Sequence, residues 1–180
     1  MEVDQAREAG TDRARASAFV RLADGELDRS YRLARIILGD GGDAEDAVHD
    51  AALKAWEHFG ELREHERFDA WFGRILVNSC RAHLRRRRVP RIAVDGSPGR
   101  SSPDPAEVVV GLDALERAIF ALGPEHRTIV GLRFVSDLSV EQIAQRTGER
   151  VGTVKSRLHY ALRELRAAYE AGERTERPDR

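Results

Sequence analysis

Apolar residues recur along most of the chain at the three- to four-residue spacing of amphipathic helices. This spacing predicts three helices before a central break in the pattern, over residues 14–38, 44–59 and 69–88, with Asp69 as the N-cap of the third. The sequence Gly-Asp-Gly-Gly-Asp at residues 39–43 ends the first of them. Because no segment shows the sustained alternation of a β-strand, we expect a helical domain in this half.

The break in the pattern lies at residues 95–105, which are rich in Pro, Gly and Ser and offer nothing to a hydrophobic core. Within and just after it, Asp104, Pro105 and Glu107 have the N-cap, N1 and N3 spacing of a helix start. The sequence therefore predicts an all-α fold. It comprises two small helical domains, residues 14–92 and 106–170, a flexible linker at 93–105, and disordered ends at 1–13 and 171–180.

Residues 138–166 predict a helix-turn-helix. Ser139 and Gln142 have capping-box spacing at the start of its first helix, and Gly148 allows the positive φ of a sharp turn. Hydroxyls and cations gather in the first turns of the second helix, which suits a helix whose N-terminal end enters the major groove of DNA. Two amphipathic helices joined by a glycine turn also occur in all-α proteins that bind no nucleic acid, and that alternative stays open here.

A basic stripe follows the third predicted helix. Between Asp69 and Asp95 there is no acidic residue but there are seven arginines. Helical spacing places on one face the residues Trp71, Arg74, Asn78, Arg81, Arg85 and Arg88. Guanidinium groups suit a nucleic-acid backbone, and the aromatic and amide side chains suit exposed bases. The alternative is a solvated basic end of a helix, which the helix dipole favours.

The second predicted helix carries the opposite charge. No Lys or Arg occurs from Ile36 to Leu53, and an outward face combines Leu53 with acidic residues and a histidine, namely Asp46, His49, Asp50 and Glu57. Such a face suits a basic protein surface better than DNA. A solvated helix with acids near its N-terminus is the alternative. A metal site is a weaker interpretation, because the spacing matches no known ligand pattern.

Bulk properties exclude several classes of function. The 30 basic and 31 acidic residues give a formal net charge of −1, which argues against a uniformly basic surface. A single cysteine, Cys80, excludes an internal disulfide framework and a cysteine-rich zinc site. There is no glycine-rich phosphate loop, and no histidine has a catalytic partner at a recognisable spacing. We therefore expect that the chain is not an enzyme and binds no metal or cofactor. Since no apolar run could span a membrane, we expect a soluble cytoplasmic protein without membrane insertion.

The chain resembles bacterial RNA polymerase sigma factors of the extracytoplasmic-function (ECF) group. The resemblance rests on residues 31–59 (YRLARIILGDGGDAEDAVHDAALKAWEHF), 68–88 (FDAWFGRILVNSCRAHLRRRR) and 121–166, which begin ALGPEHRTIVGLRF. It implies a subunit that binds the polymerase core and directs promoter recognition, promoter opening and transcription initiation. The alternative is a helix-turn-helix regulator that is not a polymerase subunit.

The resemblance also implies site residues. It assigns docking on the clamp helices of the largest core subunit to Asp43, Asp46, His49, Asp50, Leu53 and Glu57. It assigns the −10 element of promoter DNA, with base capture by the loop at 60–68, to Arg63, Phe68, Trp71, Arg74, Asn78, Arg81, Arg85 and Arg88. It assigns the −35 element to Arg150, Gly152, Thr153, Lys155, Ser156, Arg157, His159 and Tyr160.

Two further points come from the resemblance. Members of this group are commonly held by an anti-sigma factor, which is therefore a candidate partner. The chain also differs from residues usual in the family at three positions, His49, Ala82 and Glu149, of which the last occupies a turn position that is usually apolar.

Overall fold

The computed structural model describes the backbone of residues 2–88 and 114–176 and the side chains of residues 12–87 and 114–174. Within these residues every regular element is helical, so the all-α prediction is confirmed. The predicted linker at 93–105 and the predicted helix start at Asp104 lie outside the described residues.

Three helices form the N-terminal domain: α1 (Glu2–Leu38), α2 (Gly41–His58) and α3 (Phe68–Arg88), with short 3₁₀ turns at Phe59–Glu61 and His65–Arg67 between the last two. Asp40 is the N-cap of α2, and its carboxylate accepts a hydrogen bond from the Asp43 N–H at 2.9 Å. The α1–α3 core is built largely from alanines and large apolar side chains. It includes Leu33, Ile37, Ala47, Ala51, Phe72, Leu76 and Val77, all buried.

Two predicted boundaries in this domain differ from the structure. Helix α1 begins at Glu2, although residues 1–13 were expected to be disordered. Residues 2–13 contain one glycine, no proline and several strong helix formers, which favour a helix that continues toward the N-terminus. Helix α3 begins at Phe68, so Asp69 lies in the first turn instead of at the N-cap. The preceding 3₁₀ turn leads directly into the helix there.

The C-terminal domain contains α4 (Ala114–Ala121), α5 (Pro124–Phe134), α6 (Val140–Thr147) and α7 (Val151–Glu176). The predicted helix-turn-helix is α6 and α7. Its capping box is confirmed, with the Ser139 side chain accepting from Gln142 N–H and the Gln142 side chain accepting from Ser139 N–H. Gly148 ends α6 at a φ of 73°, as predicted.

Helix α7 extends past residue 170, where the sequence predicts a disordered tail. Its last turns are rich in Ala, Glu and Arg, and Arg166 donates to Glu170 at 2.8 Å across one turn. Such helix formers and paired charges stabilise a helix even where little packing supports it, which explains the longer element.

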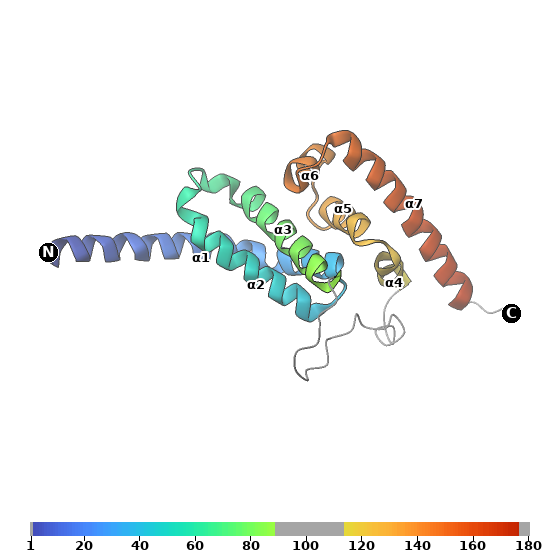
Figure 1. Ribbon diagram of the computed structural model, residues 1–180, viewed down its shortest axis with the longest axis horizontal. Helices are drawn as coiled ribbons and strands as arrows, with labels where there is room; N and C mark the ends of the chain where they lie inside the picture. Colours follow the sequence, from blue (N-terminus) through green and yellow to red (C-terminus); the bar gives the residue numbers. More distant parts are fainter. Residues whose placement is uncertain (1, 89–113, 177–180) are drawn as a thin grey trace.

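The two domains pack against each other (Figure 1). Helix α5 lies on α1, and helix α6 lies on α3. Buried side chains from both domains form one hydrophobic cluster, in which Leu33 and Phe72 belong to the first domain and Ile129 and Ile143 to the second. An ion pair between Arg35 of α1 and Glu116 of α4 also joins them. The sequence predicts two tethered domains, but it does not predict this contact.

Two glycines in helix interiors permit the close approach. A methyl group added at Gly131 of α5 would lie 2.8 Å from Leu33 Cδ1 of α1, closer than carbon atoms pack. A methyl group added at Gly73 of α3 would meet the guanidinium of Arg146 from α6. Glycine inside a helix lowers helix stability by about 0.5–1 kcal/mol relative to alanine. At both positions the helix is therefore less stable, but the domains can come into contact.

Gly148 offers a test of the turn in the helix-turn-helix. We expect Gly148→Ala to lower the free energy of unfolding by about 1–2 kcal/mol, because an L side chain disfavours the left-handed region. No atom lies within 4 Å of the added carbon, so the effect is that of the backbone alone. Urea unfolding measures it. Gly172→Ala in α7, also in open space, is the control and should be neutral or stabilising by up to about 1 kcal/mol. Equal effects of the two substitutions would contradict the assignment.

Candidate nucleic-acid interface

The predicted basic stripe is present on α3. Arg74, Asn78 and Arg85 are exposed along one face of the helix, and Trp71 is half-buried beside them. Arg63 is exposed in the loop between the two 3₁₀ turns. The side chain of Arg88 lies outside the described residues. The stripe therefore offers an aromatic ring, an amide and at least two solvent-facing guanidiniums to a bound strand.

One predicted DNA contact, Phe68, is instead part of the core. It is 2% exposed and packs among Phe19, Phe59 and Phe72, with ring centroids 5.2–6.2 Å apart within this cluster. In this conformation it cannot contact DNA. The buried Phe68 ring fixes the start of α3 against the core. The Trp71 ring packs against it, with the two ring centroids 5.9 Å apart. The aromatic cluster thus orients the first turn of the basic stripe.

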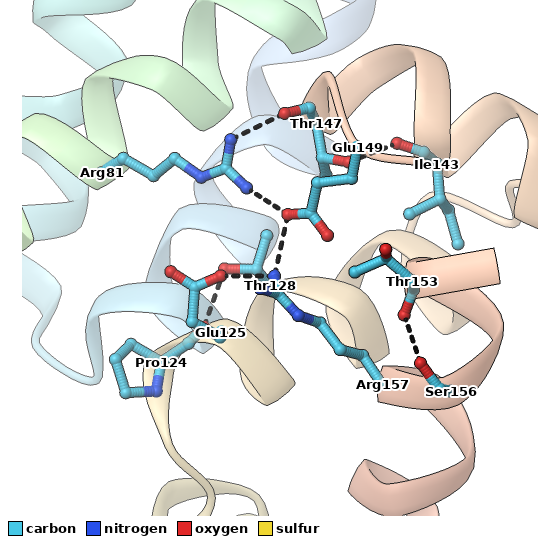
Figure 2. A network of polar contacts seen from close by, with 10 residues as sticks. All are labelled: Arg81, Pro124, Glu125, Thr128, Ile143, Thr147, Glu149, Thr153, Ser156 and Arg157. Carbon is cyan, nitrogen blue, oxygen red and sulfur yellow. Dashed lines mark hydrogen bonds and ion pairs between the residues drawn. The ribbon is translucent and has the colours of Figure 1, made fainter. Parts of the chain in front are cut away.

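The first turns of α7 are largely exposed, as predicted. Solvent reaches the side chains of Arg150, Lys155, Ser156, His159 and Tyr160, and also Gly152, while Thr153 and Arg157 are half-buried. The Ser156 hydroxyl already donates to the carbonyls of Gly152 and Thr153 within its own helix, and Figure 2 shows the bond to Thr153. Cations and aromatic side chains are therefore the groups most available to DNA.

Glu149 links the two basic surfaces (Figure 2). Its Oε1 accepts from Arg81 Nη2 of α3 at 2.8 Å and from Arg157 Nη1 of α7 at 2.9 Å. Arg81 Nη1 also donates to the Thr147 carbonyl at 2.8 Å, and Arg157 pairs with Glu125 at 2.7 Å. Two arginines assigned to different DNA elements thus share one carboxylate oxygen.

The acidic face of α2 divides into two groups. Asp46, His49, Leu53 and Glu57 are exposed, Leu53 by 49%, so an apolar side chain stands in solvent among charges. The other two predicted residues turn toward α3. Asp43 pairs with Arg87, and Asp50 Oδ2 lies 3.0 Å from His83 Nε2 and 3.7 Å from Arg86. The hydrogen bond from His83 lowers the pKa of Asp50.

The remaining chemistry is limited. Cys80 is fully buried, and burial raises the pKa of its thiol to about 12, so the thiol is inert at neutral pH. Among residues 12–87 and 114–174 no group of three or more His, Cys, Asp or Glu could hold a metal ion. None of the described helices combines the length and the apolar character that crossing a membrane requires.

The sequence missed the contacts that join distant residues. The Arg81–Glu149 pair joins positions 68 residues apart, and helical periodicity carries no information on such a pair. A signal did exist, because Glu149 is a charge at a turn position that is usually apolar. An unexpected charge of this kind points to a partner elsewhere in the fold.

Comparisons with known proteins agree with this geometry. Residues 22–89 match the family model of sigma-70 region 2, and residues 118–167 match that of sigma-70 region 4. The chain is 35% identical over 170 residues to the ECF RNA polymerase sigma factor SigL of Mycobacterium tuberculosis. The alignment covers 89% of this chain and 94% of the relative. It is 35% identical over 136 residues to RNA polymerase sigma factor SigV of Bacillus subtilis, covering 76% and 81%.

A solved structure shares the fold. The sigma factor RpoE of Bartonella quintana, in complex with the anti-sigma factor NepR, superposes with a TM-score of 0.63 at 24% identity, covering 84% of this chain and 94% of that chain. At this identity the likeness concerns the arrangement of helices alone.

The division of the α2 face can be tested by stability. We expect Asp50→Ala to lower the free energy of unfolding at pH 7 by about 0.5–1 kcal/mol, because His83 and Arg86 lose their partner. Asp46→Ala, on the exposed side, is the control and should change it by less than about 0.5 kcal/mol.

The same pair of variants has a pH dependence with a defined sign. The pKa of Asp50 is lowered in the folded state, so its contribution is present above the unfolded value of about 3.9 and is lost as the pH falls below it. The gap between wild type and Asp50→Ala should therefore shrink below about pH 4. Chemical denaturation at several pH values measures it, and a gap that widens in acid would contradict the pairing.

Proposed function

Because the chain belongs to the ECF group of RNA polymerase sigma factors, we propose that three of its surfaces divide the work of initiation. The exposed side of α2 binds the polymerase core, the α3 stripe binds the −10 element, and the start of α7 binds the −35 element. The polymerase supplies the chemistry. The observation that carries the proposal is the separation of charge: exposed acids gather on one face of α2, whereas exposed cations gather along α3 and in the first turns of α7.

The clamp helices of the largest core subunit are the proposed partner of α2. Asp46 and Glu57 supply negative charge, and Leu53 supplies an exposed apolar anchor between them. Complementary charge steers two proteins together, whereas a buried apolar side chain contributes most to affinity. Asp43 and Asp50 do not contact the polymerase in this proposal. They support the surface indirectly, because their pairs with side chains of α3 hold α2 in place.

Promoter opening is assigned to the α3 stripe and the loop before it. Melting DNA gives up stacking, which the protein can offset by stacking unpaired bases on an aromatic ring beside a cationic track. Trp71 provides the ring, Asn78 an amide for base edges, and Arg74 and Arg85 the track. Arg63, which is exposed in the loop before α3, supplies a further cation.

Duplex recognition is assigned to the first turns of α7. Arg150 and Lys155 are exposed there, and His159 and Tyr160 lie one to two turns further on. Cations at the N-terminal end of a recognition helix contact both phosphates and guanine edges in the major groove. This domain therefore fixes the upstream position of the complex.

A regulator that acts without the polymerase is disfavoured as the second candidate. Such a protein needs a sensor or ligand site in its N-terminal half, yet α1–α3 are packed by one continuous core. An anti-sigma factor stays a candidate partner. The sigma factor RpoE of Bartonella quintana, which shares the fold, is bound to one.

Alanine substitutions in α7 test the function. We expect Arg150→Ala with Lys155→Ala to lower run-off transcription with core polymerase by at least about tenfold, which corresponds to about 1.4 kcal/mol from two lost contacts. The promoter is first selected by run-off transcription from a promoter library. Arg166→Ala with Arg174→Ala, which removes two cations further along α7, is the matched control and should retain activity.

A pull-down with core polymerase separates the possible causes of a loss. The Arg150 and Lys155 variant should still bind the core, because the proposed core surface lies on α2. If the variant kept full transcription, the assignment of α7 would be wrong. A helical adaptor that never contacts DNA predicts that result.

The free chain should bind promoter duplex poorly. Its net charge is −1, its α2 face is acidic, and Arg81 and Arg157 are already paired with Glu149. We expect core polymerase to tighten binding to the same labelled duplex by at least about tenfold in fluorescence anisotropy at fixed salt. Core polymerase alone is the control. Tight, sequence-specific binding by the free chain would contradict the proposal.

A further inference from the structure

We propose that Glu149 is an autoinhibitory contact: it joins the two DNA-binding surfaces, so the chain must separate its domains before it can span a promoter. This inference rests on the proposed function, which assigns α3 and α7 to different DNA elements. It adds a closed state of the free chain and names the residue that holds it.

The chemistry of the contact resembles that of bound DNA. A carboxylate is a compact anion whose oxygens accept charge-assisted hydrogen bonds from guanidinium groups, as a phosphate does. Glu149 Oε1 takes such bonds from Arg81 and Arg157 together (Figure 2). The Glu149 side chain is only 15% exposed, so solvent screens these bonds less than it screens pairs on the surface. Both arginines are therefore occupied in the free chain.

The geometry excludes simultaneous binding of both elements in this state. Arg81 and Arg157 share one oxygen atom and so lie a few ångströms apart. The elements are named for positions about 25 base pairs apart, which is about 85 Å of duplex at 3.4 Å per base pair. One domain could reach its element, but the other could not reach its own without moving away.

Close packing elsewhere shows that the contact is more than one chance ion pair. Arg146 of α6 has a side chain only 10% exposed, lies against Gly73 of α3, and is 3.7 Å from Asp69. On the other side of the interface Gly131 of α5 lies against Leu33 of α1. Glycines at two separate helix crossings give the closed state a shape that larger residues would prevent.

The closed state is nevertheless able to open. Glu149 Oε2 is buried and has no hydrogen-bond partner among the described residues. A buried acceptor without a partner loses its hydration and offsets part of what Oε1 gains. A partner with higher affinity for the open state can therefore shift the equilibrium.

The proposed polymerase surface is accessible while the domains are closed. Helix α2 packs against α1, α3 and the Phe59–Glu61 turn, and Asp46, His49 and Leu53 face solvent. Core polymerase can therefore bind the closed chain first and open it afterwards. DNA binding would then follow polymerase binding, which keeps the free subunit off promoters.

Pulsed electron–electron double resonance on the full free chain tests the closed state. Nitroxides are attached at Ala70→Cys on α3 and Ala167→Cys on α7, both exposed, while the buried Cys80 stays unlabelled. We expect one narrow distance distribution in the otherwise wild-type chain. Glu149→Ala should lose the narrow peak and extend to longer distances.

Two further variants make the result specific. Gly131→Leu changes no charge but pushes α5 away from α1, so it should broaden the distribution as Glu149→Ala does. Glu170→Ala removes the same charge as Glu149→Ala from a pair within α7, and it should keep the narrow peak.

The proposal is overturned if the starting chain already shows a broad distribution, or if Glu149→Ala keeps the narrow peak. Neither outcome tests the assignment of α7 to DNA, because the measurement involves no DNA and no polymerase. Loss of the α7 assignment would instead appear as full transcription by the Arg150 and Lys155 variant.

Discussion

The rest of the structure depends on one constraint, the close approach of helices from the two domains. Gly131 lets α5 lie on α1, and Gly73 makes room for the Arg146 side chain of α6 beside α3. Because of these two approaches, the hydrophobic cluster continues from one domain into the other, and Glu149 comes within hydrogen-bond distance of Arg81. A chain with larger side chains at these positions would keep each helix and lose the relation between the domains.

The charge pattern gains its meaning from this arrangement. A net charge of −1 is unsuited to DNA as a whole, but acidic residues predominate on α2 and arginines on α3. Part of that balance is internal, since Asp43 and Asp50 neutralise cations of α3 and Glu149 neutralises cations of both basic surfaces. Distribution decides what each face can bind, and the total charge does not.

Local features could be predicted from the sequence because they depend on neighbours in the chain. The Ser139 capping box, the Gly148 turn and the exposed positions of Arg74 and Asn78 all follow from spacing within one or two helical turns. The family resemblance rests on the same local blocks and is confirmed by the region 2 and region 4 matches.

Features that depend on tertiary contacts could not be predicted. Phe68 has the sequence context of a loop residue available to DNA, yet Phe19 of α1 and Phe59 of the turn after α2 pack against it, together with Phe72 one turn further along α3. Asp50 has the spacing of a surface acid, yet His83 on another helix pairs with it. In each case a pattern that predicts exposure on one element is changed by a side chain from another element.

The shared arginines give the basic residues two distinct roles. Arg81 and Arg157 both stabilise the closed arrangement and belong to surfaces assigned to DNA, so a substitution at either position alters two equilibria of opposite sign. Weaker DNA contact and easier opening then partly cancel in any measured affinity. The side chains of Arg150 and Lys155 are exposed, so a substitution at either position weakens the DNA contact without easing the opening of the domains. The affinity that each arginine contributes to DNA is therefore separable only in a chain whose domains are already apart.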